Sequence, residues 1–213
     1  MGNRAIIKPV DKNIGVYLHW NGGRDSVEAF LKYCELRGFR SFGGKHADGY
    51  GIARFVQVVS NFFEGSLCIG ICTGIEETEE CAKWIDNGIY VIDGWNIVKR
   101  IPEYIIEQND YDLQEMLLSI DEAQPYNDQL TKDFIEAKEV PTDSLGIGDE
   151  VFIYDDTAYR EPKCKIYKIV GIGKNKCING YNVNNVPYTN KYPNLGADNI
   201  NNYLLDKTYR KAN

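Results

Sequence analysis

Residues 15–38 read GVYLHWNGGRDSVEAFLKYCELRG, and this stretch predicts a strand, a tight turn and an amphipathic helix in direct succession. The turn signal is the run Asn21 to Gly23, which follows a short segment rich in aromatic and aliphatic side chains. Asp25 is placed to cap the helix, with Glu28 reaching back from the third position. Apolar residues then recur at helical spacing as far as Gly38. They are Val27, Phe30, Leu31 and Cys34.

The sequence on either side of this stretch extends an α+β pattern. Upstream, residues 4–8 (RAIIK) predict a strand that pairs with residues 15–20 as a hairpin. Downstream, an apolar stripe predicts a second helix that ends before Gly65. That stripe comprises Ile52, Phe55, Val56, Val59 and Phe62 or Phe63. With a strand over 66–72 and a hairpin over 89–99, residues 1–100 predict an antiparallel sheet covered by two helices.

The remainder of the chain predicts an acidic helical segment and a small β-rich domain. Pro102 suits the first turn of a helix, and residues 101–142 are helical in composition, with a break expected at Pro125. Residues 145–213 contain short strand patterns separated by turn signals, among them Asn179-Gly180. This pattern is typical of a small SH3-like β-barrel. The predicted fold class is therefore α+β.

Charge is strongly segregated along the chain, whose net charge is −7. Residues 1–100 carry 12 basic and 12 acidic side chains, residues 101–150 carry two and 14, and residues 151–213 carry ten and five. Three interpretations fit the acidic segment: a solvated helical face, an intramolecular partner for the basic domain, or a surface for a basic groove on another protein. In the third, carboxylates supply the negative field that a nucleic-acid-binding protein normally meets on phosphates. The predicted partner-binding residues are Glu103, Glu107, Asp110, Asp112, Glu115, Asp121 and Glu122.

Two further groups of residues have the chemistry of a site. His19, Arg24, His46 and Arg54 have the side chains needed for metal-independent RNA cleavage. One histidine would accept the 2′-hydroxyl proton and the other would protonate the leaving oxygen. The structural alternative is that His19 is an ordinary strand residue and Arg24 a solvated one. The second group predicts a basic face that meets phosphates, with a solvated strand face as its alternative. It comprises Lys163, Lys165, Lys168, Lys174 and Lys176.

The rest of the sequence narrows the functional class. The common nucleotide-binding, metalloprotease and hydrolase motifs do not occur, and we expect neither a metal nor a cofactor. The N-terminus reaches polar residues too soon for a signal peptide, and no apolar run is long enough to span a membrane. The six cysteines are therefore expected to be free thiols in a cytoplasmic protein without membrane contact.

Four segments of the N-terminal half resemble a family of small proteins carried by Firmicutes plasmids, conjugative elements and phages. These segments are NRAIIK (3–8), residues 15–38, YGIARFVQVVSNFF (50–63) and DNGIYVIDGW (86–95). The likeness covers roughly the first 100 residues, and a weaker likeness appears towards the end in IGDEVFIYDD and NINNYL. Some small proteins of such elements are anti-CRISPR proteins that disable the type II effector nuclease, and this chain is similar in size and acidity.

The resemblance implies an inhibitor of host CRISPR immunity whose partner is the effector nuclease or its guide-RNA complex. The residues leave two alternatives open. One is a small ribonuclease acting on guide or other RNA, and the other is a nucleic-acid-binding module restrained by its own acidic segment.

Overall fold

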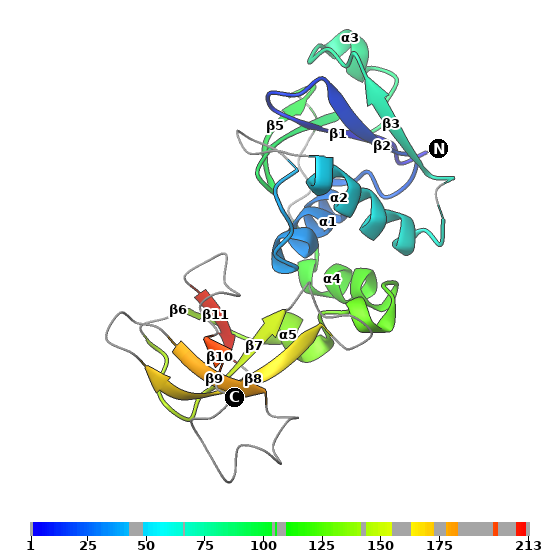
Figure 1. Ribbon diagram of the computed structural model, residues 1–213. Helices are drawn as coiled ribbons and strands as arrows, with labels where there is room; N and C mark the ends of the chain where they lie inside the picture. Colours follow the sequence, from blue (N-terminus) through cyan, green and yellow to red (C-terminus); the bar gives the residue numbers. More distant parts are fainter. Residues whose placement is uncertain are drawn as a thin grey trace. The chain divides into compact units, whose positions relative to one another are not determined.

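The computed structural model describes residues 2–42, 49–65, 67–103, 105, 110–141, 144–154, 163–172, 178–182, 198–199 and 208–211. The chain divides into two compact units, Met1–Gln124 and Pro125–Asn213 (Figure 1). The acidic segment predicted over 101–142 contributes to both of them.

A mixed sheet forms the centre of the first unit, with its strands in the order β3-β2-β1-β4-β5. The strands are β1 (Ala5–Pro9), β2 (Ile14–Leu18), β3 (Ile69–Thr73), β4 (Ile89–Asp93) and β5 (Asn96–Ile101). The two predicted hairpins, β1-β2 and β4-β5, are confirmed as antiparallel pairs. They are joined by a parallel pairing of β1 with β4, in which Ile6 lies opposite Ile89. The sheet is thus rich in antiparallel pairs, but it is not purely antiparallel.

Helices cover both faces of this sheet. Helices α1 (Arg24–Leu36) and α2 (Gly49–Phe62) lie on one face, and the short helix α3 (Glu79–Ala82) lies on the other (Figure 1). All five residues of β1 are buried, as expected for a central strand with both faces covered. On the α3 side the core comprises Ile6, Ala82, Ile89, Val91 and Ile101.

The first helix begins two residues earlier than a cap at Asp25 would allow. Its N-cap is Gly23, which makes no side-chain capping bond, so the prediction of an Asp25 cap is wrong. The preceding Gly22 is needed because its backbone donates to the Asn3 carbonyl at 2.8 Å, where an added Cβ would lie 2.6 Å from that oxygen. Glu28 pairs with Arg24 and also accepts a hydrogen bond from Tyr111.

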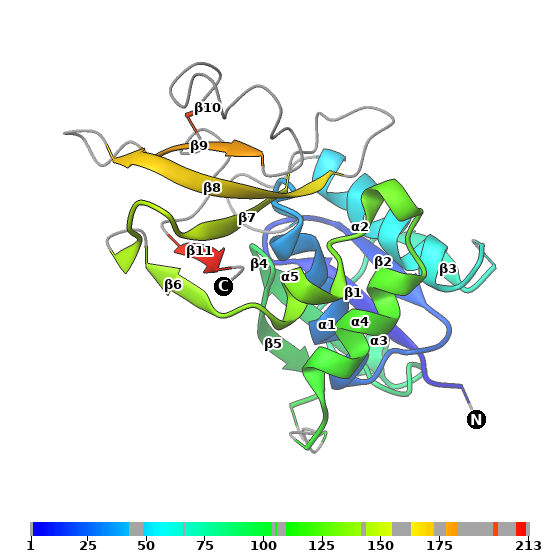
Figure 2. The same cartoon turned by 90° about the horizontal axis from the view of Figure 1, so that it is seen from below.

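The helix of the acidic segment, α4 (Leu113–Glu122), packs on α1 and α2 (Figure 2). The prediction that Pro102 begins a helix is wrong, because residues 102–103 form a bend and turn after β5 and α4 begins at Leu113. Asp112 caps α4 by accepting hydrogen bonds from the backbone N–H groups of Gln114 and Glu115. Leu117 and Ile120 face inward.

The second unit contains a sheet whose described strands have the order β10-β9-β8-β7-β11-β6. Its elements are η1 (Tyr126–Asp128), α5 (Lys132–Glu136), β6 (Glu139–Pro141), β7 (Glu150–Tyr154), β8 (Cys164–Ile172), β9 (Ile178–Asn182), β10 (Asp198–Asn199) and β11 (Thr208–Lys211). A buried cluster of Leu145, Val151, Tyr167 and Ile169 lies against it.

The strands of the second unit differ from prediction at one turn signal. Asn179-Gly180 lies within β9, opposite Gly171 and Ile169, so its assignment as a turn is wrong. The register shifts between Ile169 and Gly171, and such bulges accommodate glycine inside strands. Closure of this sheet into an SH3-like barrel stays a prediction.

Candidate functional site

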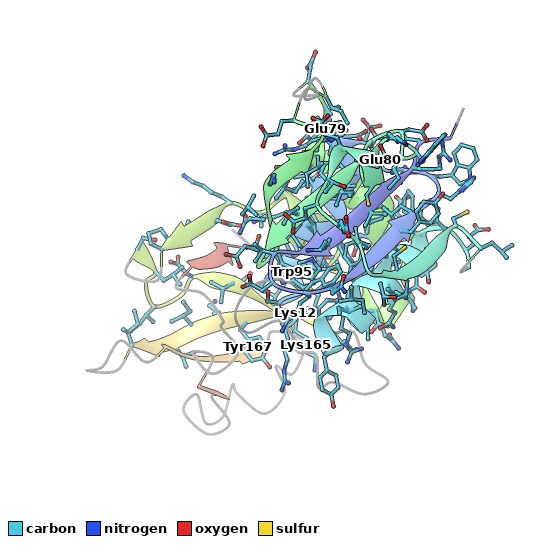
Figure 3. All side chains as sticks on the ribbon, turned by 90° about the horizontal axis from the view of Figure 1, so that it is seen from above. Lys12, Glu79, Glu80, Trp95, Lys165 and Tyr167 are labelled. Atoms are coloured by element: carbon cyan, nitrogen blue, oxygen red, sulfur yellow. The ribbon has the colours of Figure 1, made fainter. Side chains whose placement is uncertain are left out.

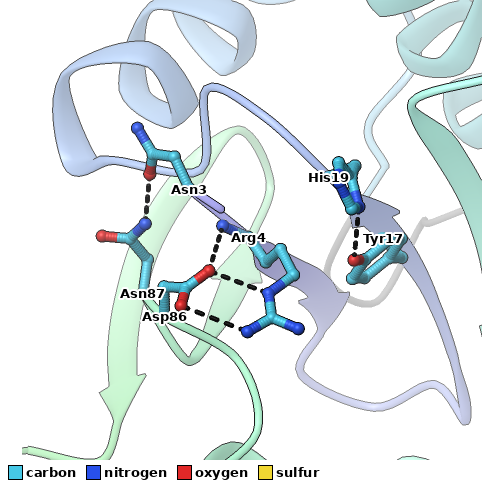
Figure 4. Close-up of polar contacts among 6 residues, drawn as sticks. All are labelled: Asn3, Arg4, Tyr17, His19, Asp86 and Asn87. Carbon is cyan, nitrogen blue, oxygen red and sulfur yellow. Dashed lines mark hydrogen bonds and ion pairs between the residues drawn. The ribbon is translucent and has the colours of Figure 1, made fainter. Parts of the chain in front are cut away.

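His19 lies just after β2, at the surface of the first unit. Its Nδ1 atom is 3.1 Å from the hydroxyl oxygen of Tyr17, and its ring meets Trp20 edge to face with centroids 4.9 Å apart (Figure 4). Its backbone N–H donates to the carbonyl of Cys68 at 2.8 Å, which extends the pairing of β2 with β3. The ring of His19 is thus oriented by its strand neighbours and is exposed to solvent.

The other residues predicted to form a catalytic group with His19 have contacts of their own. Arg24, at the start of α1, pairs with Glu28 at 3.3 Å. Arg54, on α2, bonds to Gln57 and stacks its guanidinium 5.6 Å from the ring centre of Phe39. His46 lies outside the described residues.

The side chain that sequence reasoning missed near His19 is Arg4, which precedes β1. In the register of β1 with β2, Ile6 lies opposite Tyr17, so alternation places Arg4 on the same face as Tyr17. The carboxylate of Asp86 forms a bidentate ion pair with the guanidinium of Arg4, with Oδ2 2.8 Å from Nε and Oδ1 3.2 Å from Nη2 (Figure 4). The backbone N–H of Arg4 also donates to Asp86, at 3.1 Å. These hydrogen bonds lower the pKa of Asp86 to about 2 and raise that of Arg4.

A cavity of about 320 Å³ opens beside this ion pair. Its charged and apolar walls include Arg4, Lys83, Trp84, Asp86, Pro102 and Ile105. The indole of Trp84 is 73% exposed, and the ammonium of Lys83 lies 5.2 Å from its ring centre. No short motif marks this cavity in the sequence, because its residues come from three separate segments.

The predicted acidic surface is formed in part by α4. Glu103, Asp110, Asp112, Glu115 and Glu122 are exposed, whereas Glu107 lies outside the described residues. The prediction that Asp121 belongs to this surface is wrong. Asp121 is only 5% exposed, and its carboxylate accepts a hydrogen bond from the buried hydroxyl of Tyr33 at 2.6 Å. Its role is therefore in the packing of α4 on α1 rather than in partner binding.

The predicted basic face is divided by the geometry of β8. Lys165 and Lys168 are three residues apart on a regular part of the strand, so they lie on opposite faces. Lys165 shares its face with Tyr167, and both are labelled in Figure 3. Lys163 pairs with Asp128 of the acidic segment at 2.8 Å. The remaining two lysines, Lys174 and Lys176, lie outside the described residues.

The cysteine side chains were predicted to be free thiols. The five described cysteines are free thiols, and burial raises the pKa of Cys34 far above that of an ordinary thiol.

Among the residues that the structure describes, no three His, Cys, Asp or Glu side chains are grouped to hold a metal ion. No helix in the same part of the chain has the length and apolar composition needed to cross a membrane.

Two surfaces of the first unit are therefore the candidates for a functional site: the exposed carboxylates of α4 and the cavity beside Arg4. Comparison with known proteins gives no matching family model, curated protein or solved structure.

Proposed function

We propose that this chain is a non-catalytic inhibitor, encoded by a mobile genetic element, that binds a nucleic-acid-handling protein of the host. The proposed partner is a type II CRISPR effector nuclease or its guide-RNA complex. The carboxylates of α4 would occupy the basic groove that normally meets phosphates. The observation that carries this proposal is the fixed, outward presentation of acidic side chains by α4.

The inner side of α4 is anchored by polar as well as apolar contacts. Gln124, just past its end, donates to the Val58 carbonyl at 3.2 Å and accepts from Asn61 at 2.9 Å. Asp121 bonds to Tyr33 one turn earlier. Because both inward polar groups are bonded to α1 or α2, the orientation of the helix is fixed before any partner binds. Preorganisation of this kind reduces the free-energy cost of association.

The outer side of α4 carries two exposed carboxylates. Glu115 and Glu122 are seven residues apart, which is about two helical turns or roughly 10 Å, so they lie on the same side of the helix. Residues 101–150 carry 14 acidic and two basic side chains, so this part of the chain contributes a net negative field.

Charge reversal tests this proposal with a matched control. We expect the triple variant Asp110→Lys, Glu115→Lys, Glu122→Lys to bind the purified effector nuclease about tenfold or more weakly at about 0.15 M salt. Asp112 is left in place because it caps α4. The salt dependence of the dissociation constant should also become shallower, since fewer charges contribute to binding.

The control carries the same change of charge at exposed positions away from α4: Asp11→Lys, Glu64→Lys, Glu76→Lys. It should retain wild-type affinity, because the proposal places the attraction in α4 and not in net charge. Titration calorimetry with the nuclease alone and with its guide-RNA complex would measure both variants. Equal losses in the two variants, or unchanged binding by the α4 variant, would contradict the acidic-surface mechanism.

A further inference from the structure

The guanidinium of Arg4 is held in place while part of it remains available. Asp86 engages its Nε and Nη2 atoms, and the backbone N–H of Arg4 bonds to the same carboxylate. Within the described part of the chain, the Nη1 atom has no hydrogen-bond partner, and the side chain is 38% exposed. A guanidinium has five N–H donors in a fixed plane, so an oriented edge remains for an anion at the cavity wall.

A second cation, Lys83, lines the same cavity. It pairs with Glu80, which lies beside Glu79 on α3 (Figure 3). Its ammonium retains further donors after this bond, because it has three. The cations that line the cavity are each paired with a carboxylate, Arg4 with Asp86 and Lys83 with Glu80, so they offer an anion oriented donors rather than a net positive charge. The exposed Glu79 adds a further negative charge, which implies that a bound anion needs a further source of binding energy.

Trp84 supplies that further interaction. Its indole is 73% exposed beside the two cations, and Pro102 and Ile105 provide apolar wall on the same cavity. Stacking of a base on an aromatic side chain contributes binding energy whatever the base, because every base has a π-face. A volume of about 320 Å³ lies at the lower limit for small-molecule sites, roughly 300 Å³, and admits one nucleotide but not a duplex.

We propose that this cavity binds a single nucleotide, with its phosphate at Arg4 and Lys83 and its base stacked on Trp84. The nucleotide is either free or one unit of a single-stranded nucleic acid. This site lies apart from the α4 carboxylates on which the proposed inhibitory function depends. Its test is accordingly independent of that function.

Calorimetry on the full chain tests the proposal with adenosine monophosphate, adenosine, inorganic phosphate and a short single-stranded RNA. We expect the monophosphate to bind more tightly than adenosine or phosphate, because each of these lacks one of the two contacts. If the RNA binds no tighter than the monophosphate, a free nucleotide is the ligand. An RNA that binds at least tenfold tighter identifies a strand instead. Absence of binding by both, or phosphate binding as tightly as the monophosphate, would overturn the proposal.

Two variants locate the site. Trp84→Ala and Lys83→Gln should each weaken monophosphate binding about tenfold, since they remove the stacking surface and a phosphate donor. Both side chains are exposed, so the fold should tolerate their loss. Trp20→Ala and Lys12→Gln are matched controls at exposed positions that do not line the cavity. Equal effects of the controls, or wild-type affinity in Trp84→Ala, would exclude this cavity as the site.

Discussion

A single carboxylate, Asp86, joins the beginning of β1 to the segment before β4. It accepts one hydrogen bond from the Arg4 backbone and two from its side chain. Next to it, Asn87 donates to Asn3, and its own carbonyl accepts from Arg100 at 2.9 Å. Polar bonds thus fix the same edge of the first unit at which the cavity opens.

The first prediction concerns the pH dependence of this ion pair. The pKa of Asp86 is lowered to about 2, so its stabilising effect is present above the ordinary carboxyl pKa, about 3.9, and is lost as the pH falls towards 2. We expect Asp86→Asn to reduce the free energy of unfolding at pH 7. The difference from wild type should disappear between about pH 4 and pH 2.

Urea unfolding at pH 7, 4 and 2 measures this difference. Asp11→Asn, at an exposed position after β1, is the control and should change stability little at any of these pH values. A difference between Asp86→Asn and wild type that is the same at all three pH values would show that the ion pair does not contribute as described.

At this scale the sequence predicts apolar residues better than polar ones. Val27, Phe30 and Leu31 were predicted to be buried from their helical spacing, and all three are. Asp121 was predicted at the surface, yet it is buried against Tyr33, 88 residues away. Periodicity reports which face of a helix is apolar, but it cannot identify a polar residue whose partner lies in another element.

Among the elements, the capping of α4 is the one most open to a direct test. Asp112 accepts from two backbone N–H groups of the first turn, and those donors have no partner within a helix. We expect Asp112→Ala to lower the free energy of unfolding by about 1 kcal/mol, and Asp112→Asn by clearly less, because Asn is also a good N-cap. Thermal or urea unfolding compares the two; equal destabilisation would mean that capping is not the cause.

Sequence patterns predicted the elements that depend on neighbouring residues, but they missed pairings between segments far apart in the chain. A hairpin was predicted over 89–99, and Gly94 at its turn has the positive φ of 65° that such turns favour. The parallel pairing of β1 with β4 was not predicted, because no turn residue marks a contact between strands so far apart. The cap at Asp112 was present in the sequence, followed three residues later by Glu115, but Pro102 offered a competing start.

On the scale of the whole molecule, the boundary between units falls inside the acidic segment. Charge and composition predicted residues 101–142 as one segment, whereas α4 belongs to the first unit and α5 to the second. The reason is that α4 carries an apolar side that completes the packing of α1 and α2. Net charge describes the exposed side of a helix and gives no information about its buried side.

This division predicts how fragments behave. A fragment of residues 1–124 should unfold cooperatively, whereas residues 1–100 should lose cooperative unfolding or have a much lower melting temperature, because removing α4 exposes its contacts on α1 and α2. Circular dichroism melting curves distinguish the two fragments. Equal melting temperatures would show that α4 adds nothing to the stability of the first unit.

The candidate sites differ in how well they can be predicted from the sequence. The acidic surface follows from composition, because carboxylates without compensating cations are exposed on almost any fold. The cavity beside Arg4 depends on bringing residues 4, 82–86, 102 and 105 together, which the strand order achieves. The sequence analysis grouped Lys165 and Lys168 on one basic face, but the alternation of side chains along β8 places them on opposite faces.

The parallel pairing of β1 with β4 also has a consequence for biosynthesis. When β1 leaves the ribosome, its partner β4 is still about 80 residues from being made, which at roughly 5–20 residues per second is a wait of several seconds. Until β3 is made the hairpin of β1 and β2 lacks a neighbour on both sides, and β1 keeps an apolar edge open until β4 is made as well. Translation speed between β2 and β4 therefore sets how long the nascent chain is exposed to aggregation.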